Sequence, residues 1–234
     1  MPLTLKNFYR QWWQPDPSRT IFYYDFEQNL NDSSGNWNNI TSSNWIWYDN
    51  IGWQYVVQNN VTSNWYLIHP WFNSLSDFTV SFWVYVVNPW SGRMPMLFGQ
   101  QENVTPYKWI TVWFWPDMYN SQWNTNSFSF MMDGSTYHYT WWKTLDSWYH
   151  VVFTRISWTC KVYINNNKEL EYTDNTSFVN WPYRFLFNSN NDSSKQWWWN
   201  TWAKMDKFIL ENVWWSAQEI ADYFNATKSL YGIS

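Results

Sequence analysis

The sequence predicts an all-β sandwich of two antiparallel sheets with one short C-terminal helix. Short segments with alternating or continuous apolar residues recur along the chain, and clusters of Asn, Ser and Asp separate them. A helical signal is confined to the C-terminal end. The chain has 234 residues, of which 45% are hydrophobic and 14% are charged, so it can bury a substantial core.

The expected strands follow from this alternation. The clearest is FTVSFWVYVV at 78–87, where Phe78, Val80 and Phe82 fall on one face and the residues between them on the other. Further strands are expected at 21–26, 108–115, 127–132, 148–156, 160–165, 183–187 and 204–210.

The expected helix lies near 216–226. Ser216 and Glu219 have the spacing of a capping box, in which each side chain bonds the backbone N–H of the other residue. Ile220, Tyr223 and Phe224 then form one apolar stripe at helical spacing. A single short helix therefore closes an otherwise β chain.

Composition and charge indicate how the chain divides into domains and exclude several classes of partner and site. We expect a leader or docking segment at 1–19 and one domain at 20–234. The net charge of −4 argues against a nucleic-acid partner, which requires a basic surface. No apolar segment is long enough for membrane insertion. The single cysteine, Cys160, excludes an internal disulfide and a multi-thiolate zinc site.

Three segments, in order, resemble the laminin-G-like branch of the concanavalin A-like lectin and glucanase jelly rolls. They are YYDFEQNLNDSSGNWNN (23–39), DFTVSFWVY (77–85) and the Trp-x-His-Val hairpin DSWYHVVFTRISWTCKVYINNNKEL (146–170). The segment AKMDKFILENVWWSAQEIADYF (203–224) adds a strand that carries Asp and then the closing helix. The resemblance implies a concanavalin A-like jelly-roll sandwich and says little about a particular ligand.

The resemblance also implies a non-catalytic module that binds a glycan or a surface protein in adhesion or attachment. Glucanase members carry three carboxylates at alternate positions of one strand. No such Glu-x-Asp-x-Glu run occurs here, so we do not expect an enzyme. Alternatives are a structural or assembly protein without a ligand, or a glycan-degrading enzyme with acidic residues elsewhere. The oligomeric state stays open.

The N-terminal segment lacks the apolar stretch and cleavage site of a secretory signal. This fits a virion component, such as a tail fibre released by lysis, as well as a cytoplasmic or unusually exported protein. We expect an extracellular or virion-surface location.

One candidate metal site involves Asp206, which simple alternation places on the same strand face as Phe208 and Leu210. A buried carboxylate must find hydrogen-bond donors or a cation. Members of the resembled family often hold a structural calcium between the first and last strands, and the resemblance places Asp25 near Asp206 there. The alternative is that each Asp is hydrogen-bonded or exposed in its own strand.

Tryptophans in polar loops are the candidate ligand-binding residues, because an indole ring can stack on the apolar face of a sugar. The candidates are Trp141, Trp142, Trp198 and Trp199, and the pair Trp214-Trp215 invites the same interpretation. Trp83 and Trp148 fall inside expected strands, where packing in the core or on a sheet face is the expected role.

The balance of tryptophan and glycine raises a different hypothesis. The chain has 25 tryptophans and 6 glycines, whereas ordinary chains contain about 7% glycine. Trp37 and Trp158 stand at turns, and Trp198, Trp199, Trp202, Trp214 and Trp215 also stand where such a fold would use glycine. The gene could come from a source that reads UGA as glycine, with UGA translated here as tryptophan. The alternative is a genuinely tryptophan-rich protein.

Overall fold

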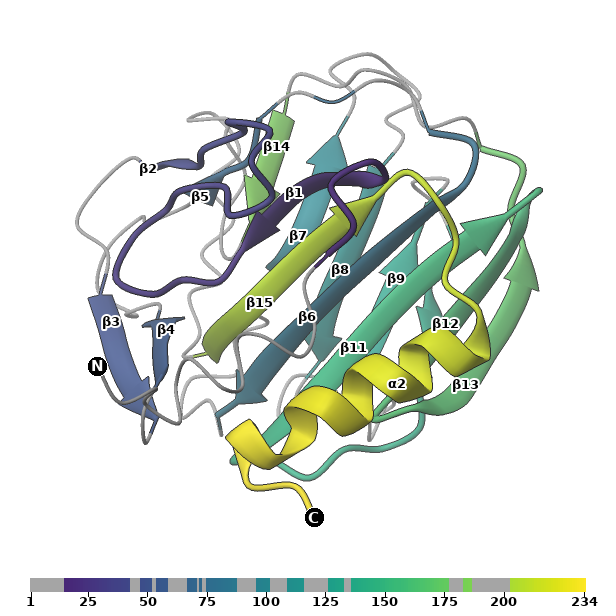
Figure 1. The fold of residues 1–234 in the computed structure, drawn as a ribbon. Helices are drawn as coiled ribbons and strands as arrows, with labels where there is room; N and C mark the ends of the chain where they lie inside the picture. Colours follow the sequence, from purple (N-terminus) through teal and green to yellow (C-terminus); the bar gives the residue numbers. More distant parts are fainter. Residues whose placement is uncertain are drawn as a thin grey trace.

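The described part of the chain forms two antiparallel sheets, with a helix on the outer face of the larger sheet (Figure 1). The computed structural model describes residues 15–42, 47–51, 54–58, 67–70, 72, 75–87, 96–101, 109–115, 126–132, 136–176, 183–186 and 203–234. This architecture confirms the expected all-β sandwich with a short C-terminal helix.

The larger sheet has eight strands, with β6 and β15 near its centre. In spatial order its strands are β13 (Asn167–Thr173), β12 (Thr159–Ile164), β11 (Ser147–Ile156), β6 (Phe78–Val86), β15 (Ala203–Glu211), β4 (Gln54–Gln58) and β3 (Trp47–Ile51), while β1 (Thr20–Tyr24) also pairs with β15. The first and last described strands therefore lie side by side, as in Figure 1.

The smaller sheet has seven strands. In spatial order they are β10 (His138–Tyr139), β9 (Ser127–Met131), β8 (Trp109–Trp115), β7 (Met96–Gln101), β14 (Tyr183–Leu186), β5 (Leu67–Ile68) and β2 (Thr41–Ser42).

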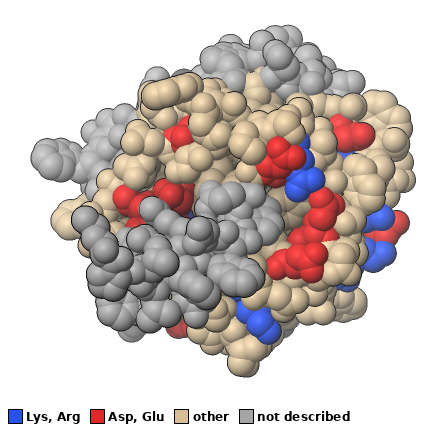
Figure 2. All heavy atoms as spheres, in the orientation of Figure 1, with Lys and Arg blue, Asp and Glu red and all other residues tan. Residues whose placement is uncertain are grey.

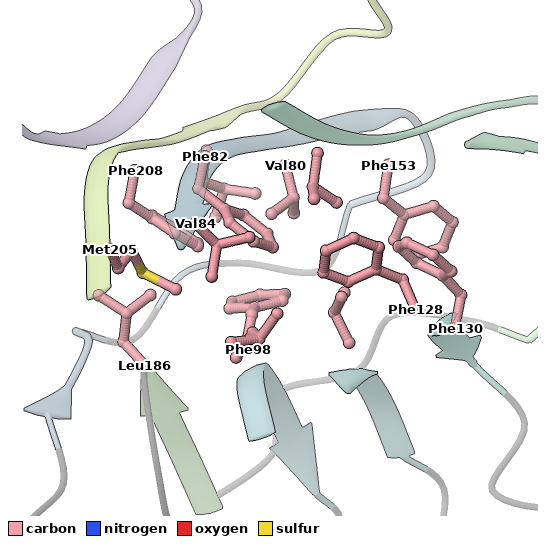
Figure 3. Close-up of a cluster of buried hydrophobic side chains, with 14 of the residues drawn as sticks. Val80, Phe82, Val84, Phe98, Phe128, Phe130, Phe153, Leu186, Met205 and Phe208 are labelled. Carbon is pink, nitrogen blue, oxygen red and sulfur yellow. The ribbon is translucent and has the colours of Figure 1, made fainter. Parts of the chain in front are cut away.

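Apolar side chains from both sheets meet in one core. Figure 3 shows Val80, Phe82 and Phe208 of the larger sheet facing Phe98 and Phe128 of the smaller sheet. All five are fully buried, and Phe82 and Phe98 both pack against Phe208. Burial of large apolar side chains is the main favourable term in folding, so this contact holds the two sheets together.

The helix α2 (Ala217–Thr227) continues into the 3-10 turn η2 (Lys228–Tyr231) and crosses the outer face of the larger sheet (Figure 1). Its capping box is formed as expected: Glu219 N–H donates to the Ser216 hydroxyl, and Ser216 N–H donates to the Glu219 carboxylate at 2.8 Å. Ile220, Tyr223 and Phe224 face a second buried cluster on this side of the sheet.

A β-bulge in β15 overturns one expectation. Asp206 pairs with Trp83 and Ile209 pairs with Ser81, so β15 has one residue more than β6 between these pairs. The extra residue reverses the alternation. Phe208 consequently packs in the core between the sheets, whereas Asp206 contacts Tyr231 beside the helix. The prediction that Asp206 shares a face with Phe208 and Leu210 was wrong for this reason.

The described end of the expected leader is tied to the domain. The Arg19 side chain lies 2.9 Å from the Glu211 carboxylate of β15 and donates to Glu219 of α2 at 2.8 Å. The boundary between a leader at 1–19 and a domain at 20–234 stays a prediction, because residues 1–14 lie outside the described part of the chain.

Candidate ligand-binding site

The exposed aromatic segment consists of Tyr137, Tyr139, Trp141 and Trp142, which lie just before, in and after β10. The side chain of Trp141 is 78% exposed and that of Trp142 is 59% exposed. The rings of Tyr137 and Tyr139 are also exposed and stack with their centres 6.1 Å apart. Two of the four tryptophans expected to bind a ligand therefore lie on the surface, next to two tyrosines that the sequence analysis missed.

The backbone of this segment is fixed by a largely buried ion pair. The Lys143 ammonium lies 2.8 Å from the Glu169 carboxylate of β13 and donates to the Trp141 carbonyl at 2.7 Å. The Glu169 Oε2 atom, which also accepts from Lys143, accepts from Trp141 N–H at 3.0 Å. A charge pair that also satisfies backbone groups holds its geometry better than an exposed surface pair.

The same segment is also bonded to the smaller sheet. Thr140 N–H donates to the Phe128 carbonyl at 2.9 Å, and the Thr140 hydroxyl accepts from Phe128 N–H at 2.9 Å. Since Phe128 is in β9 and Glu169 is in β13, both sheets hold the segment. Trp141 and Trp142 are thus displayed from a pre-organised backbone, which lowers the ordering cost of binding.

The remaining candidates do not form a second exposed platform among the described residues. Trp198 and Trp199 lie outside the described part of the chain. Trp215 is buried: its backbone N–H donates to the Thr79 hydroxyl at 2.8 Å and its indole N–H to Glu211 at 2.6 Å. The interpretation of the pair Trp214-Trp215 as a sugar platform is therefore corrected for Trp215, which is buried, while the glycine hypothesis for both positions stays a prediction.

Two other exposed tryptophans have an unusual backbone. Trp37 has φ 62° and is 87% exposed, and Trp158 has φ 73° and is 44% exposed. This left-handed region is disfavoured for bulky L residues and open to glycine. The described tryptophans with positive φ are these two, so Trp141 and Trp142 do not share the feature. The UGA hypothesis itself stays a prediction.

The candidate calcium residues lie where β1 meets β15. Asp206 is fully buried, and both of its carboxylate oxygens are used: Oδ1 accepts from Lys207 N–H at 2.7 Å and Oδ2 accepts from Tyr231 O–H at 2.6 Å. The Lys207 side chain interacts with the Tyr23 hydroxyl and with the carboxylates of Asp206 and Asp25.

The electrostatics of this cluster are set by burial and by the lysine. Burial raises the pKa of Asp206 to about 7, and the nearby Lys207 charge opposes that rise. Burial by itself would lower the pKa of Lys207, but Tyr23, Asp206 and Asp25 outweigh it and the pKa lies above its usual value.

The donor set does not fit a calcium ion. Calcium takes six to eight oxygen ligands, whereas both Asp206 oxygens already accept protein hydrogen bonds and Lys207 adds a positive charge that acts on Asp206. Across the part of the chain that the structure describes, no three His, Cys, Asp or Glu side chains form a group suited to a metal. Calcium binding by Asp25 and Asp206 stays an unmeasured prediction.

The helix-bearing side of the molecule carries charged side chains of both signs. Figure 2 shows mostly uncharged atoms there, with blue side chains next to red ones. No helix within the described ranges is long and apolar enough to cross a membrane.

No family model and no curated protein sequence matches the chain. Solved structures do match it. Domain 4 of AbnA, a GH43 extracellular arabinanase from Geobacillus stearothermophilus in complex with arabinotriose, matches with TM-score 0.66 and 17% identity over 87% of this chain and 97% of that domain.

Two binding domains match with comparable TM-scores. The binding domain of Paraclostridial Mosquitocidal Protein 1 gives TM-score 0.67 and 17% identity over 93% of this chain and 56% of the other. The botulinum neurotoxin type G receptor binding domain gives TM-score 0.64 and 12% identity over 88% and 51%. The chain thus spans about half the length of these two structures. At such identities the likeness shows the fold alone, an all-β sandwich of antiparallel sheets.

Proposed function

We propose that the chain is a non-catalytic, laminin-G-like binding module that recognises a glycan through the exposed aromatic segment. The observation that carries the proposal is the display of Trp141 and Trp142 from a backbone that Lys143 and Glu169 hold in place. Rigid aromatic side chains provide large contact area at low conformational entropy cost. The neighbours AbnA domain 4, solved with arabinotriose, and the botulinum receptor binding domain support a binding role for this fold.

In this proposal the module acts in adhesion or attachment on an extracellular or virion surface. The binding surface lies at the end of the sandwich where β10 of the smaller sheet approaches β13 of the larger sheet, since the Trp141 segment is bonded to both. A surface protein carrying the glycan would present the same chemistry. A role in assembly without a ligand is the main alternative.

A glycan array with the protein of the printed sequence tests the proposal, followed by calorimetric titration of any oligosaccharide that binds. Trp141→Ala and Trp142→Ala should each weaken binding at least about tenfold, which corresponds to about 1.4 kcal/mol. Trp47→Ala is the matched control, because Trp47 is also exposed but lies in β3 at the opposite edge of the larger sheet.

Two results would contradict the proposal. If no glycan on the array binds, the assembly alternative is favoured. If a glycan binds equally well to the wild type and to both tryptophan variants, the site lies elsewhere. Incubation of the bound oligosaccharide with the protein, followed by product analysis, should show no cleavage.

A further inference from the structure

The exposed aromatic segment contains one extra residue in its pairing with the neighbouring chain at β9. Thr140 N–H donates to the Phe128 carbonyl at 2.9 Å. Lys143 N–H donates to the Asn126 carbonyl at 2.5 Å. The two donors are three positions apart and the two acceptors are two positions apart, which is the count of a β-bulge. The bulge explains how two consecutive tryptophans can both be exposed, whereas regular alternation would turn one of them inward.

The tyrosines of the segment lie on the outer face of the smaller sheet. Tyr139 is paired with Ser129 of β9. The residues on either side of Ser129, Phe128 and Phe130, both belong to the core between the sheets. Because side chains alternate along a strand and paired residues share a face, Ser129 and Tyr139 point away from that core. The Tyr137 ring is centred 6.1 Å from the Tyr139 ring, with the two planes 27° apart, so it lies on the same side.

The exposed rings follow one another along an extended backbone that carries little charge. At roughly 3.3 Å per residue, residues 137–142 extend about 16 Å, which is longer than one sugar and similar to a chain of several sugars. These six residues include no Lys, Arg, Asp or Glu. The charged groups bonded to their backbone, Lys143 and Glu169, are paired with each other, and their side chains are only 6% and 13% exposed. A ligand along this segment therefore meets aromatic rings without an unpaired protein charge among these groups.

We propose that the glycan bound by this module is a linear, uncharged chain that lies along residues 137–142, with the tyrosines and the tryptophans contacting successive sugars. This inference rests on the proposed function and specifies its ligand, an internal stretch of a polysaccharide instead of a single sugar at the end of a branch. Several rings fixed on one backbone add their contacts without a separate ordering cost for each. A charged chain would find no complementary charge on the segment.

Calorimetric titration of the wild type with oligosaccharides of increasing length is the first test. The probes are linear cello-, xylo-, manno- and arabino-oligosaccharides of one to six sugars. In a series that binds, the affinity should rise at least about tenfold from the disaccharide to the tetrasaccharide, because further rings are engaged, and then level off. A tetrasaccharide methylated at its reducing and non-reducing ends should bind as tightly as the unmodified one, since the contacts are made by its interior.

Variants of the tyrosines separate this inference from the proposed function. Tyr137→Ala and Tyr139→Ala should each remove most of the gain between the disaccharide and the tetrasaccharide, and leave the affinity for the disaccharide unchanged. Tyr137→Phe and Tyr139→Phe keep the rings and should keep the gain. Trp214→Ala is the matched control, because Trp214 is also exposed but lies between β15 and α2, and it should bind both oligosaccharides like the wild type.

Four results would overturn the inference while leaving the proposed function intact. They are equal affinity for the monosaccharide and the tetrasaccharide, loss of binding when the chain ends are blocked, a gain with length that survives both tyrosine-to-alanine substitutions, and an array on which only branched or anionic glycans bind. If no glycan binds at all, the inference and the proposed function fail together. The length series and the end-blocked tetrasaccharide use only the wild type, so they decide the question even if a tyrosine variant does not fold.

Discussion

The two aromatic regions of this protein use the same residue types in opposite ways. Under α2, the helix-side cluster of Trp83, His150, Trp215, Tyr223 and Tyr231 is buried between the helix and the outer face of the larger sheet. Around β10, the side chains of the exposed aromatic segment are accessible to solvent, those of Trp141 and Trp142 most of all.

The two regions also differ in which groups make the hydrogen bonds. In the helix-side cluster, side chains satisfy one another: the Trp83 indole donates to Thr227 at 3.2 Å, and that of Trp215 donates to Glu211 at 2.6 Å. In the exposed segment, the bonds are made by the backbone of Trp141, which leaves its ring unconstrained by them. Aromatic content therefore indicates a binding surface only where no element covers the rings and the backbone is fixed independently.

Replacement of Trp215 should have the largest effect on stability. Trp215→Ala empties a buried indole site and removes a hydrogen bond from Glu211, so we expect a loss of about 3–5 kcal/mol in unfolding free energy. Trp142→Ala, on the exposed segment, should change it by no more than about 0.5 kcal/mol. Equilibrium urea denaturation of both variants measures the difference. Equal losses would show that the two regions do not differ in this way.

The helix-side cluster should also respond to acid through His150. Burial lowers the pKa of His150 to about 3, and the Ser81 hydroxyl lies 2.8 Å from its Nε2. Between pH 3 and 6.5 the native protein binds fewer protons at this residue than the unfolded chain does. The contribution of His150 to stability is therefore present above pH 6.5 and is lost as the pH falls, by about 1.4 kcal/mol per pH unit.

Asp206 acts in the opposite direction. Its pKa of about 7 in the folded state lies above the ordinary 3.8, so its contribution is present below about pH 4 and is lost as the pH rises toward 7. The two effects should largely cancel in the wild type between pH 4 and 6.5. His150→Gln should leave a stability that falls with rising pH relative to the wild type, and Asp206→Asn the reverse. Parallel pH profiles of all three proteins in urea denaturation would contradict both assignments.

Strands β6, β11 and β15 of the larger sheet and the helix could be predicted because their patterns are local. In β6 the apolar residues Phe78, Val80 and Phe82 recur with a period of two on one face, and Ser216 with Glu219 marks the helix start. Several strands were missed, among them β7 in the middle of the smaller sheet and β13 at the edge of the larger one. β13 reads NKELEYT and has few apolar residues, so its pairing rather than its pattern makes it a strand. The Asn-Asn pair before β13 could have indicated the hairpin turn that leads into this strand. Asn165 and Asn166 both have positive φ, which asparagine tolerates better than most residues.

The site could be predicted only in part. Exposed tryptophans in a polar loop suggested Trp141 and Trp142, but the ion pair that holds them joins Lys143 to Glu169, a contact between distant elements. Burial of Trp215 depends on how α2 is placed, which no local pattern specifies. The bulge at Lys207 has no glycine to announce it, so simple alternation assigned Asp206 to the wrong face.

The smallest expected effect separates a third group of tryptophans from both regions. Trp37→Gly and Trp158→Gly should each stabilise the protein by about 1 kcal/mol, because a non-glycine residue with left-handed φ carries strain that glycine relieves. The gain should be smaller for Trp158, whose ring centre lies 5.4 Å from the Arg155 guanidinium and contributes a cation–π contact.

Trp142→Gly is the control: its backbone lacks positive φ, so glycine there should only add unfolded-state entropy and lower the melting temperature slightly. Thermal unfolding of the three variants ranks them. A melting temperature for Trp37→Gly at or below that of the wild type would count against a glycine requirement at this turn. Intact-mass measurement of natively produced protein then tests the UGA hypothesis directly, because a mass that includes all 25 tryptophans is incompatible with it.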